Sequence, residues 1–536
     1  MSSQKTSESE DVIGFLSKNP GIKKILYIFI LLAIGNITIY QKYWFPPAQV
    51  WDESYHISSA AKYVKGVFFM EPHPPLGKLL IAAGEMLTNV NHGVTNNIER
   101  VEKIPHYSSV FPEGFSFAGY RLFPALFGWA NVVIFGLLLY ELLGSYVFAL
   151  AFACFYAFDN SIISNTRIAV LESFVLFGFL MCLWGFFKLF HLKTITKTNS
   201  LGPSLLMVFG FSFSVLTKSV GLALLVLWPL LFYFKKEESK RLMKIVGVQV
   251  VFFIVFFLSV WQVHFSLAKS FDSILPFNGQ YSMSSETEKA MLQLPGAAGP
   301  INTYFSLLKD NLRYFTTYES RVVHLDLSAG DSNGSFPIMW PFGSRPMAYR
   351  WNIDDPEVKQ YAYAIPNPAV WGTGLVSLIF AIGLLLAAQA FEVKGMRRET
   401  IHKLVILVVL YFSFMIPFMS IRRILYLYHY FSPLLCTILM GALILREVFF
   451  SSLQLQLLKK LKVFSVAILV AVIAFYIFIS PVTYYSEVTC EEANSRALFR
   501  FWDLRFKGCV DPALRSSDNV HLVPDTKLRP FSDWDL

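Results

Sequence analysis

Residues 463–480 read VFSVAILVAVIAFYIFIS, a run without a single charged side chain. A helix that crosses a bilayer needs about 20 predominantly apolar residues. Comparable runs recur along the chain and predict an all-α polytopic membrane protein with about eleven transmembrane helices. The expected spans are 23–43, 118–142, 145–163, 168–190, 202–217, 219–234, 246–264, 370–391, 404–420, 427–445 and 463–480. The fifth and sixth would form a short hairpin with Thr217-Lys218-Ser219 at its apex.

The composition supports this class. The chain has 536 residues, of which 54% are hydrophobic and only 15% are charged. A soluble protein of this length would carry about 25% charged residues. The net charge of +9 does not indicate a nucleic-acid partner, because the basic excess lies in short loops between apolar runs. A basic excess in such loops indicates on which side of the membrane each loop lies.

The basic loops predict the orientation of the chain. Lys and Arg gather in the segments 1–24, 188–201, 235–245, 392–403 and 446–462. By the positive-inside rule, the N-terminus is cytoplasmic and, with eleven spans, the C-terminus is external. The resulting division is a cytoplasmic segment 1–24, a transmembrane region 25–264 with the first external loop 44–117, an external loop 265–369, a transmembrane region 370–480 and an external tail 481–536.

The first external loop contains the pattern of two amphipathic surface helices. Gly66 can end the first helix, and Pro74-Pro75 can open the second, because proline at a helix start loses no hydrogen bond. The apolar stripes are Ile57, Ala60, Ala61 and Val64 in the first helix, and Leu76, Leu79, Leu80 and Ala83 in the second. Both should lie along the membrane surface.

Asp52 and Glu53 stand at the start of the first surface helix. The helix dipole favours a charged carboxylate there, so we expect an ionised acid that can serve as a base near pH 7. Asp is also a good N-cap, which is the structural alternative. The nearby His73 and Lys78 favour a functional site.

Several cations accompany the two acids at the same predicted membrane face: Arg121, Lys218, Arg422 and Arg423. Each one alone could be an interfacial anchor. Together they could bind a lipid-linked phosphate, whose oxygens suit Arg and Lys. Charges at membrane depth are costly and usually mark function.

Other polar residues remain open at this stage. Glu172 could pair with Arg167 one turn earlier, and His429 could be either packed or functional. Asp52, Glu53, His56 and His73 could gather, but their spacing requires no metal site. Cys490 and Cys509 could form a disulfide if the tail faces an oxidising compartment.

Taken together, the motifs resemble a known family. The stretches WDESYHISSAAKYVKG (51–66) and HPPLGKLL (73–80) resemble the first external loop of the protein O-mannosyltransferases, within the type C glycosyltransferase superfamily. Further similar segments follow in order: GYRLFPALFG (119–128), NTRIAVLES (165–173), LTKSVGL (216–222), WPFGSRPMAYRW (340–351), NPAVWG (367–372) and LYLYHYFSPLL (425–435).

The resemblance implies an enzyme that moves mannose from a polyprenyl-phosphate donor to Ser or Thr hydroxyls of a protein acceptor. It makes Asp52 the catalytic acid, Glu53 its neighbour and Arg121 a functional arginine of the donor site. Substrate-binding or loop-shaping roles then fall to His73, Lys78, Glu172, Arg345 and His429. The reaction requires no cofactor that the sequence indicates, and a need for a divalent metal is left open.

The same resemblance predicts a site that faces the periplasm or exterior of a bacterial plasma membrane, or the lumen of the endoplasmic reticulum in a eukaryote. The loop before the eighth span is too short for the beta-trefoil domain of the eukaryotic enzymes, which favours a bacterial form. Two alternatives stay open. One is an aminoarabinose-type transferase that glycosylates a lipid or cell-envelope glycan, and the other is a lipid-linked sugar transporter.

Overall fold

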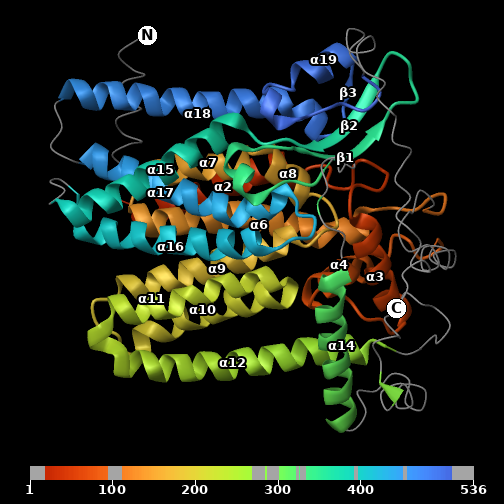
Figure 1. Cartoon of the computed structure of the whole chain (residues 1–536), viewed down its shortest axis with the longest axis horizontal. Coiled ribbons are helices and arrows are strands. Elements are labelled where there is room, and N and C mark those ends of the chain that lie inside the picture. The colour runs from red at the N-terminus through yellow and green to blue at the C-terminus, as the bar shows by residue number, and fades with distance from the viewer. Residues whose placement is uncertain are drawn as a thin grey trace.

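The computed structural model describes residues 19–94, 111–268, 301–321, 333–391, 396–450 and 455–509, and the single positions 284, 285 and 325. Long helices that lie side by side make up most of this part (Figure 1). Nine of the described helices are long and apolar enough to cross a membrane. They are α2 (Pro20–Gly35) with its continuation η1 (Asn36–Tyr40), α6 (Ala118–Leu143), α9 (Glu172–His191), α10 (Lys197–Thr217), α12 (Ser239–Ser266), α15 (Pro368–Ala390), α16 (Arg398–Ser420), α17 (Phe431–Phe450) and α18 (Leu455–Thr483).

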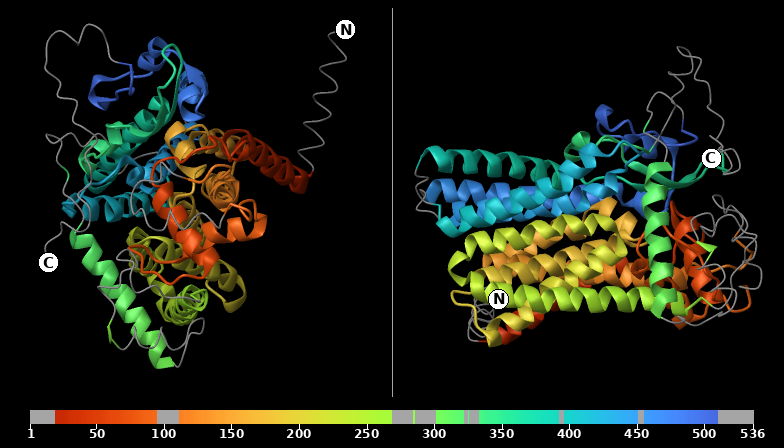
Figure 2. Two further views of the ribbon diagram at one scale, coloured as in Figure 1. Left: turned by 90° about the vertical axis from the view of Figure 1, so that its right-hand side faces the viewer. Right: turned by 60° about the horizontal axis from the view of Figure 1, so that its bottom comes forward.

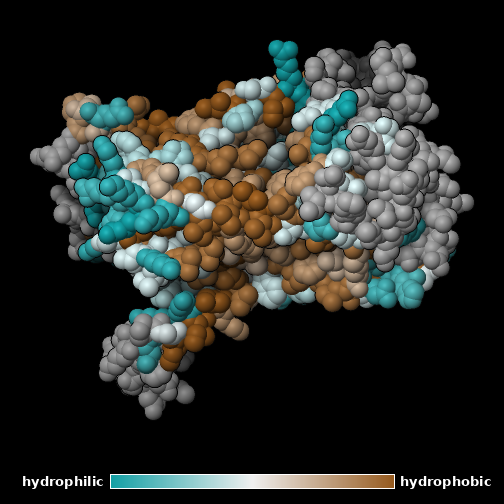
Figure 3. Space-filling model, turned by 90° about the horizontal axis from the view of Figure 1, so that it is seen from below, coloured by the Kyte–Doolittle hydropathy of each residue, from teal (hydrophilic) through white to brown (hydrophobic). Residues whose placement is uncertain are grey.

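The surface of the bundle agrees with a membrane setting. A broad hydrophobic band lies between two more hydrophilic ends (Figure 3). The protein is therefore an integral membrane protein, mostly helical, as the sequence predicts. Each of the eleven predicted spans coincides with helical structure, although two of them are not simple spans. The number of crossings and the orientation of the termini stay predictions.

The third predicted span is broken. It consists of α7 (Tyr146–Ala157) and α8 (Asn160–Thr166), which are bent by 66° at the break. Asp159 lies at the break and caps α8 by accepting the N–H of Ile162 at 2.9 Å. The same carboxylate accepts from the backbone N–H of Asn367 at 3.1 Å and from the indole N–H of Trp371 at 2.8 Å. The start of α15 therefore supplies two of the hydrogen bonds to the Asp159 carboxylate at the break.

The predicted hairpin of the fifth and sixth spans is also more complex. Helix α10 is longer than expected, and after Lys218 the chain continues as a 3₁₀ segment, η3 (Ser219–Val226), and the short α11 (Leu227–Phe234). Helix α10 packs closely on α9, because a Cβ at Gly210 would meet the backbone of Cys182 at 2.2 Å. Small residues permit such backbone contact between helices in membranes. This packing brings the end of α10 beside the start of α9.

Both surface helices of the first external loop form where predicted. Helix α3 (Glu53–Lys65) ends at Gly66, whose φ of 74° is left-handed, and α4 (Leu76–Thr88) follows directly after Pro75. The predicted apolar stripe of α4 is only half-buried, however. The buried face is the adjacent one, which carries Lys78, Ile81, Ala82 and Glu85. A lysine thus points into the protein.

A small sheet, which the all-α prediction did not include, lies at the same end of the bundle as α3 and α4 (Figure 1). Its antiparallel strands are β1 (Met347–Asn352), β2 (Lys359–Ala364) and β3 (Glu487–Val488), in that order. Short helices accompany it: η7 (Pro337–Phe342), η8 (Leu427–Tyr430), α19 (Cys490–Ser495) and η9 (Arg500–Trp502). Cys490 and Cys509 form a disulfide here, as the sequence allowed. The basic turn between α11 and α12 lies at the opposite end.

Candidate active site

Glu53 is completely buried at the start of α3. Its Oε1 accepts from the Nε of Arg121 at 2.6 Å and from the backbone N–H of Ala169 at 2.8 Å. Its Oε2 accepts from Nη2 of Arg121 at 2.7 Å and from the backbone N–H of Val50 at 2.8 Å. The carboxylate is therefore part of a buried, bidentate ion pair whose hydrogen-bonding capacity is used.

Arg121 is equally saturated. Besides the carboxylate, its guanidinium donates to the carbonyls of Trp44 at 3.0 Å, Pro46 at 2.6 Å and Ala48 at 2.7 Å. It also lies over the ring of Phe117, 4.5 Å from the centroid. An arginine has five N–H donors, and all five are engaged. This geometry disagrees with the predicted phosphate contact of Arg121, because no N–H is left for a phosphate.

A second buried arginine holds the preceding residues. Arg167 donates to the carbonyls of Ile39 at 2.7 Å, Gln41 at 2.8 Å and Lys42 at 2.8 Å. The expected pairing of Arg167 with Glu172 is therefore wrong, since the guanidinium binds backbone instead. Between them, the two arginines hold backbone carbonyls along the chain from Ile39 to Ala48.

Asp52 occupies the N-cap position of α3, but its side chain makes no capping hydrogen bond. The structural alternative for this residue is thus not realised. Desolvation of the carboxyl group and the charge of Glu172 raise its pKa to about 7, against the opposing effect of Lys218 and Lys78. With a pKa in this range, we expect the group to be divided between its two forms near pH 7, and not fully charged as the helix dipole alone predicts.

Lys218, directly after α10, forms an ion pair with Glu172 at the start of α9, with 2.8 Å between Nζ and Oε1. The same ammonium lies 4.9 Å from the ring centroid of Tyr428. The close packing of α9 on α10 explains how two residues 46 positions apart meet. Since Lys218 and Glu172 both act on the Asp52 carboxyl, all three belong to one site.

A second group of polar residues surrounds Lys78, whose charge also acts on the Asp52 carboxyl. Lys78 is buried and forms an ion pair with Glu71, which also accepts the hydroxyl of Ser59. Burial lowers the pKa of Lys78, while Glu71 and Asp52 oppose that shift. Glu71 was not singled out from the sequence, where it is one acid before His-Pro-Pro.

Two histidines complete this part of the site. The Nδ1 atoms of His56 and His73 are buried and have no hydrogen-bond partner within the described part of the chain. Burial and the charges of Lys78 and Lys218 hold the pKa of both imidazoles well below the ordinary value. Both rings are therefore neutral near pH 7, and each has a buried polar atom available to a substrate.

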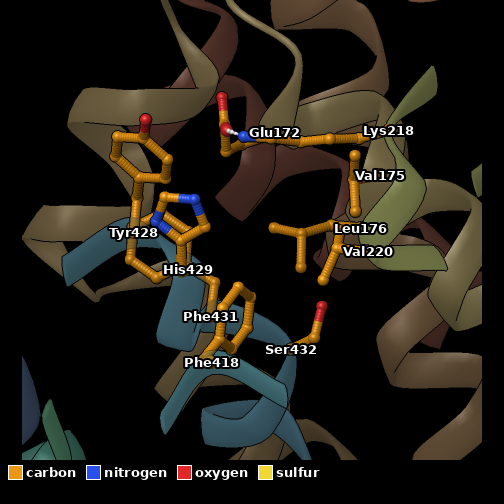
Figure 4. A pocket seen from close by; sticks show the side chains of 10 residues that line it. All are labelled: Glu172, Val175, Leu176, Lys218, Val220, Phe418, Tyr428, His429, Phe431 and Ser432. Atoms are coloured by element: carbon orange, nitrogen blue, oxygen red, sulfur yellow. Dashed lines mark hydrogen bonds and ion pairs between the residues drawn. The ribbon is translucent and has the colours of Figure 1, made fainter. Parts of the chain in front are cut away.

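A small, partly open pocket adjoins the Lys218–Glu172 pair (Figure 4). One end is polar and the remaining wall is mainly apolar, with Ser432 as an exception. The side chains come from α9, η3, α16, η8 and α17. The lining residues are Glu172, Val175, Leu176, Lys218, Val220, Phe418, Tyr428, His429, Phe431 and Ser432.

His429 faces this pocket from η8 (Figure 4). Its ring stacks between Tyr428, at 4.5 Å, and Trp340, at 5.9 Å between centroids. Its Nδ1 lies 2.9 Å from the carbonyl oxygen and 3.4 Å from the backbone nitrogen of Tyr426, so the Tyr426 backbone holds the ring in place. The ring is thus both packed and part of the pocket.

The remaining predicted arginines lie in different surroundings. Arg422 is exposed, whereas Arg423 is half-buried and acts electrostatically on His73 and His429. Arg345 lies in the turn after η7, and its guanidinium is 3.6 Å from the carboxylate of Asp503. This ion pair ties the turn to the C-terminal segment. A substrate contact of Arg345 stays a prediction.

Within the described ranges, no group of three or more His, Cys, Asp or Glu side chains could hold a metal ion. Sequence reasoning missed Glu71, Asp159 and the pocket residue Tyr428. Tyr428 and the partners of Asp159, which are Asn367 and Trp371, do lie in the segments singled out as motifs. No local pattern in the sequence links them to their contacts.

Comparison with known proteins places this site in a family. A profile described as "Dolichyl-phosphate-mannose-protein mannosyltransferase" matches residues 29–269, and one described as "C-terminal four TMM region of protein-O-mannosyltransferase" matches residues 315–502. One chain of the Saccharomyces cerevisiae protein O-mannosyltransferase Pmt1-Pmt2 complex bound to the sugar donor has a similar fold. Its TM-score is 0.71 at 14% identity, and the match covers 90% of this chain and 93% of that one.

Curated relatives match over shorter stretches. Protein O-mannosyl-transferase 1 of Rattus norvegicus is 30% identical over 170 residues, which is 32% of this chain and 22% of the relative. Dolichyl-phosphate-mannose–protein mannosyltransferase 1 of Saccharomyces cerevisiae is 24% identical over 285 residues, or 50% and 33%. The matches thus span between about a fifth and a third of these relatives.

The fold is that of a polytopic membrane protein, similar to that of the matched chain of the Pmt1-Pmt2 complex. Since the two profiles together match most of the chain, the protein belongs to the protein O-mannosyltransferase family. Both profiles describe O-mannosyltransferases, and neither describes an aminoarabinose transferase or a transporter, the two alternatives that the sequence left open.

Proposed function

We propose that this protein transfers a mannosyl residue from a lipid-linked mannosyl phosphate to a Ser or Thr hydroxyl of a protein acceptor. The names of the matched family and of the yeast relative supply the donor and acceptor classes. The observation that carries the proposal is the position of Asp52. Its carboxyl lies under the influence of two lysines and Glu172, next to a pocket with a polar end and an apolar wall.

In the proposed reaction Asp52 is the general base. A pKa raised to about 7 suits this role, because a base works best when its pKa lies near the operating pH. The acceptor oxygen attacks C1 of the sugar while its proton passes to Asp52. The bond between C1 and the phosphate oxygen breaks, and the electron pair leaves with the phosphate. A single displacement of this kind inverts the configuration at C1.

The leaving phosphate needs cations rather than a proton donor. Lys218, Lys78 and Arg423 are the basic side chains that act on Asp52 or on the histidines beside it. We assign the phosphate to this group and not to Arg121, whose N–H donors are occupied, or to Arg422, which is exposed. The apolar wall of the pocket suits the first units of a polyprenyl or dolichyl carrier, and His56 and His73 offer polar atoms to the sugar.

The proposed setting is the external side of a bacterial plasma membrane, or the lumenal side of the endoplasmic reticulum membrane in a eukaryote. The disulfide between Cys490 and Cys509 supports an oxidising compartment on the side of the site, because disulfides persist mainly in such compartments. No step of the proposal is assigned to a metal, and metal dependence is left to experiment.

Purified protein in detergent should glycosylate a Ser/Thr-rich peptide when polyprenyl-phosphate mannose is supplied. A matched peptide with Ala at every Ser and Thr is the control. GDP-mannose without a lipid carrier should give no product. Transfer from GDP-mannose alone, or transfer only to a lipid or glycan acceptor, would contradict the proposed function.

A further inference from the structure

Helix α14 (Ile301–Arg321) runs crosswise to the spans, at the end of the bundle that carries α3 and α4 (Figures 1 and 2). Seen from that end, it lies at the rim of the bundle beside α12. It belongs to none of the predicted spans, and the reaction proposed above does not use it.

One side of α14 packs on protein. Tyr304, Leu307 and Tyr314 are buried in a cluster with Trp261 and Phe265 of α12. The hydroxyl of Tyr304 donates to the carbonyl of Leu258 at 2.9 Å. Since these α12 residues lie in its last turns, α14 is fixed at the level where this span ends. That level corresponds to the boundary between lipid tails and headgroups.

The remaining surface of α14 is divided into an apolar and a basic part. Phe305 and Leu312 are 53% and 44% exposed, and they lie seven residues apart on the same side of the helix. Lys309 and Arg313 are also exposed, and at 100° per residue they follow on the next side. Thus the exposed strip of α14 is apolar along one edge, with Phe305 and Leu312, and basic along the other, with Lys309 and Arg313. The exposed Thr316 lies between the two edges.

We infer that α14 is an interfacial helix whose apolar side, Phe305 and Leu312, inserts into the lipid leaflet next to the site. A helix in the plane of the membrane buries its apolar face among the acyl chains and directs its basic face to the headgroups. Lys309 and Arg313 then reach lipid phosphates with their long side chains. Packing on the end of α12 sets the depth, and this inference does not depend on the proposed reaction.

Spin labels can test the assignment in the full-length protein in lipid nanodiscs. Cysteines are introduced singly at Phe305 and Leu312, with Lys309→Cys and Arg313→Cys as matched controls on the same helix. The native cysteines are buried, as in Cys154, Cys182 and Cys436, or form the disulfide, so the unsubstituted protein measures background labelling. A single elution peak checks the fold of each variant.

Oxygen concentrates in lipid, whereas a nickel chelate stays in water. Labels at 305 and 312 should relax more with oxygen than with the chelate, and labels at 309 and 313 should show the reverse. Equal access of the chelate to all four positions would place the apolar side in water. Protection of 305 and 312 from both reagents would mean that protein, such as a second copy, covers this side. Either result would overturn the inference.

Discussion

Two neighbouring acids of one dipeptide have opposite environments. Glu53 has a bidentate arginine, two backbone N–H donors and no exposure. Asp52 has no capping bond, a raised pKa and a surrounding group of cations and neutral histidines. A buried polar group that is fully satisfied contributes to structure. Asp52, in contrast, is partly exposed and has a strongly raised pKa, and strongly shifted pKa values are often found at functional sites.

The comparison separates residues that hold the site from residues that act in it. Arg121, Arg167 and Glu53 hold the chain that leads into α3. The second group consists of Asp52, Lys218 and Lys78. The charges of the two lysines act on the pKa of the Asp52 carboxyl. Substitutions in the first group should change stability, and those in the second should change the proposed reaction.

The largest expected change in stability is that of Arg121→Met. It leaves the Glu53 carboxylate buried without its partner, which costs about 3–5 kcal/mol. Thermal unfolding in detergent measures this loss, and Arg422→Met, at an exposed arginine, is the control with little effect. If Arg121→Met unfolded at the parent temperature and only bound the donor more weakly, Arg121 would belong to the residues that act in the reaction and not to those that hold the site.

Lys218→Met should weaken donor binding, and it should also lower the melting temperature because it leaves the buried Glu172 without its partner. Loss of one charge-assisted hydrogen bond costs about 1.5–3 kcal/mol, so the KM for polyprenyl-phosphate mannose should rise roughly 10- to 150-fold. Glu172→Gln is the companion variant, because it breaks the same ion pair but keeps the cation. Equal donor KM values in both variants would show that Lys218 serves only the ion pair.

The pH dependence should connect activity and stability through Asp52. Its carboxyl must be ionised to act as a base, so kcat/KM should rise with pH and level off above about pH 7. A folded-state pKa above the unfolded value stabilises the protein at low pH, and this contribution is lost as the pH rises through about 7. Melting temperature should therefore drift downward over the same range, less so in Asp52→Asn. If the melting temperature of Asp52→Asn fell just as much over this pH range, Asp52 would not be the cause of the fall.

The smallest effect is expected for Arg345→Gln. A partly exposed ion pair such as that with Asp503 contributes about 0–1 kcal/mol. The melting temperature should hardly move, and the donor KM should stay the same. A clear rise in donor KM would instead establish the substrate contact that the sequence suggests for Arg345.

Local signals explain what could be predicted from the sequence. Apolar runs located the long helices, because a bilayer imposes their length. Gly66 and Pro75 bounded α3 and α4 through their own backbone preferences. The proximity of Asp52, Lys78 and Lys218 followed from counting spans, since all three were placed at one membrane face.

Long-range contacts explain what could not be predicted. The partner of Glu172 is Lys218, 46 residues away, and not the nearby Arg167. Which cation pairs with Glu172 depends on the packing of α9 on α10, and no local sequence pattern predicts that packing. The break at Asp159 is similar, because two of the hydrogen bonds to its carboxylate come from the distant Asn367 and Trp371. The saturation of Arg121 by carbonyls of residues 44–48 also required the folded chain.

The most direct test of the central claim compares Asp52→Asn with Glu53→Gln in one experiment. Turnover with lipid-linked mannose and a Ser/Thr peptide is measured per folded molecule, with the melting temperature of each variant beside it. Near pH 7 Asp52→Asn should melt at or above the parent temperature, because no capping bond is lost and the cost of ionising a carboxyl with a raised pKa is removed. Turnover should fall by about 10²-fold or more, the usual contribution of a general base. Glu53→Gln should melt well below the parent protein. An Asp52→Asn protein that turns over at the parent rate would contradict the assignment of Asp52 as the base.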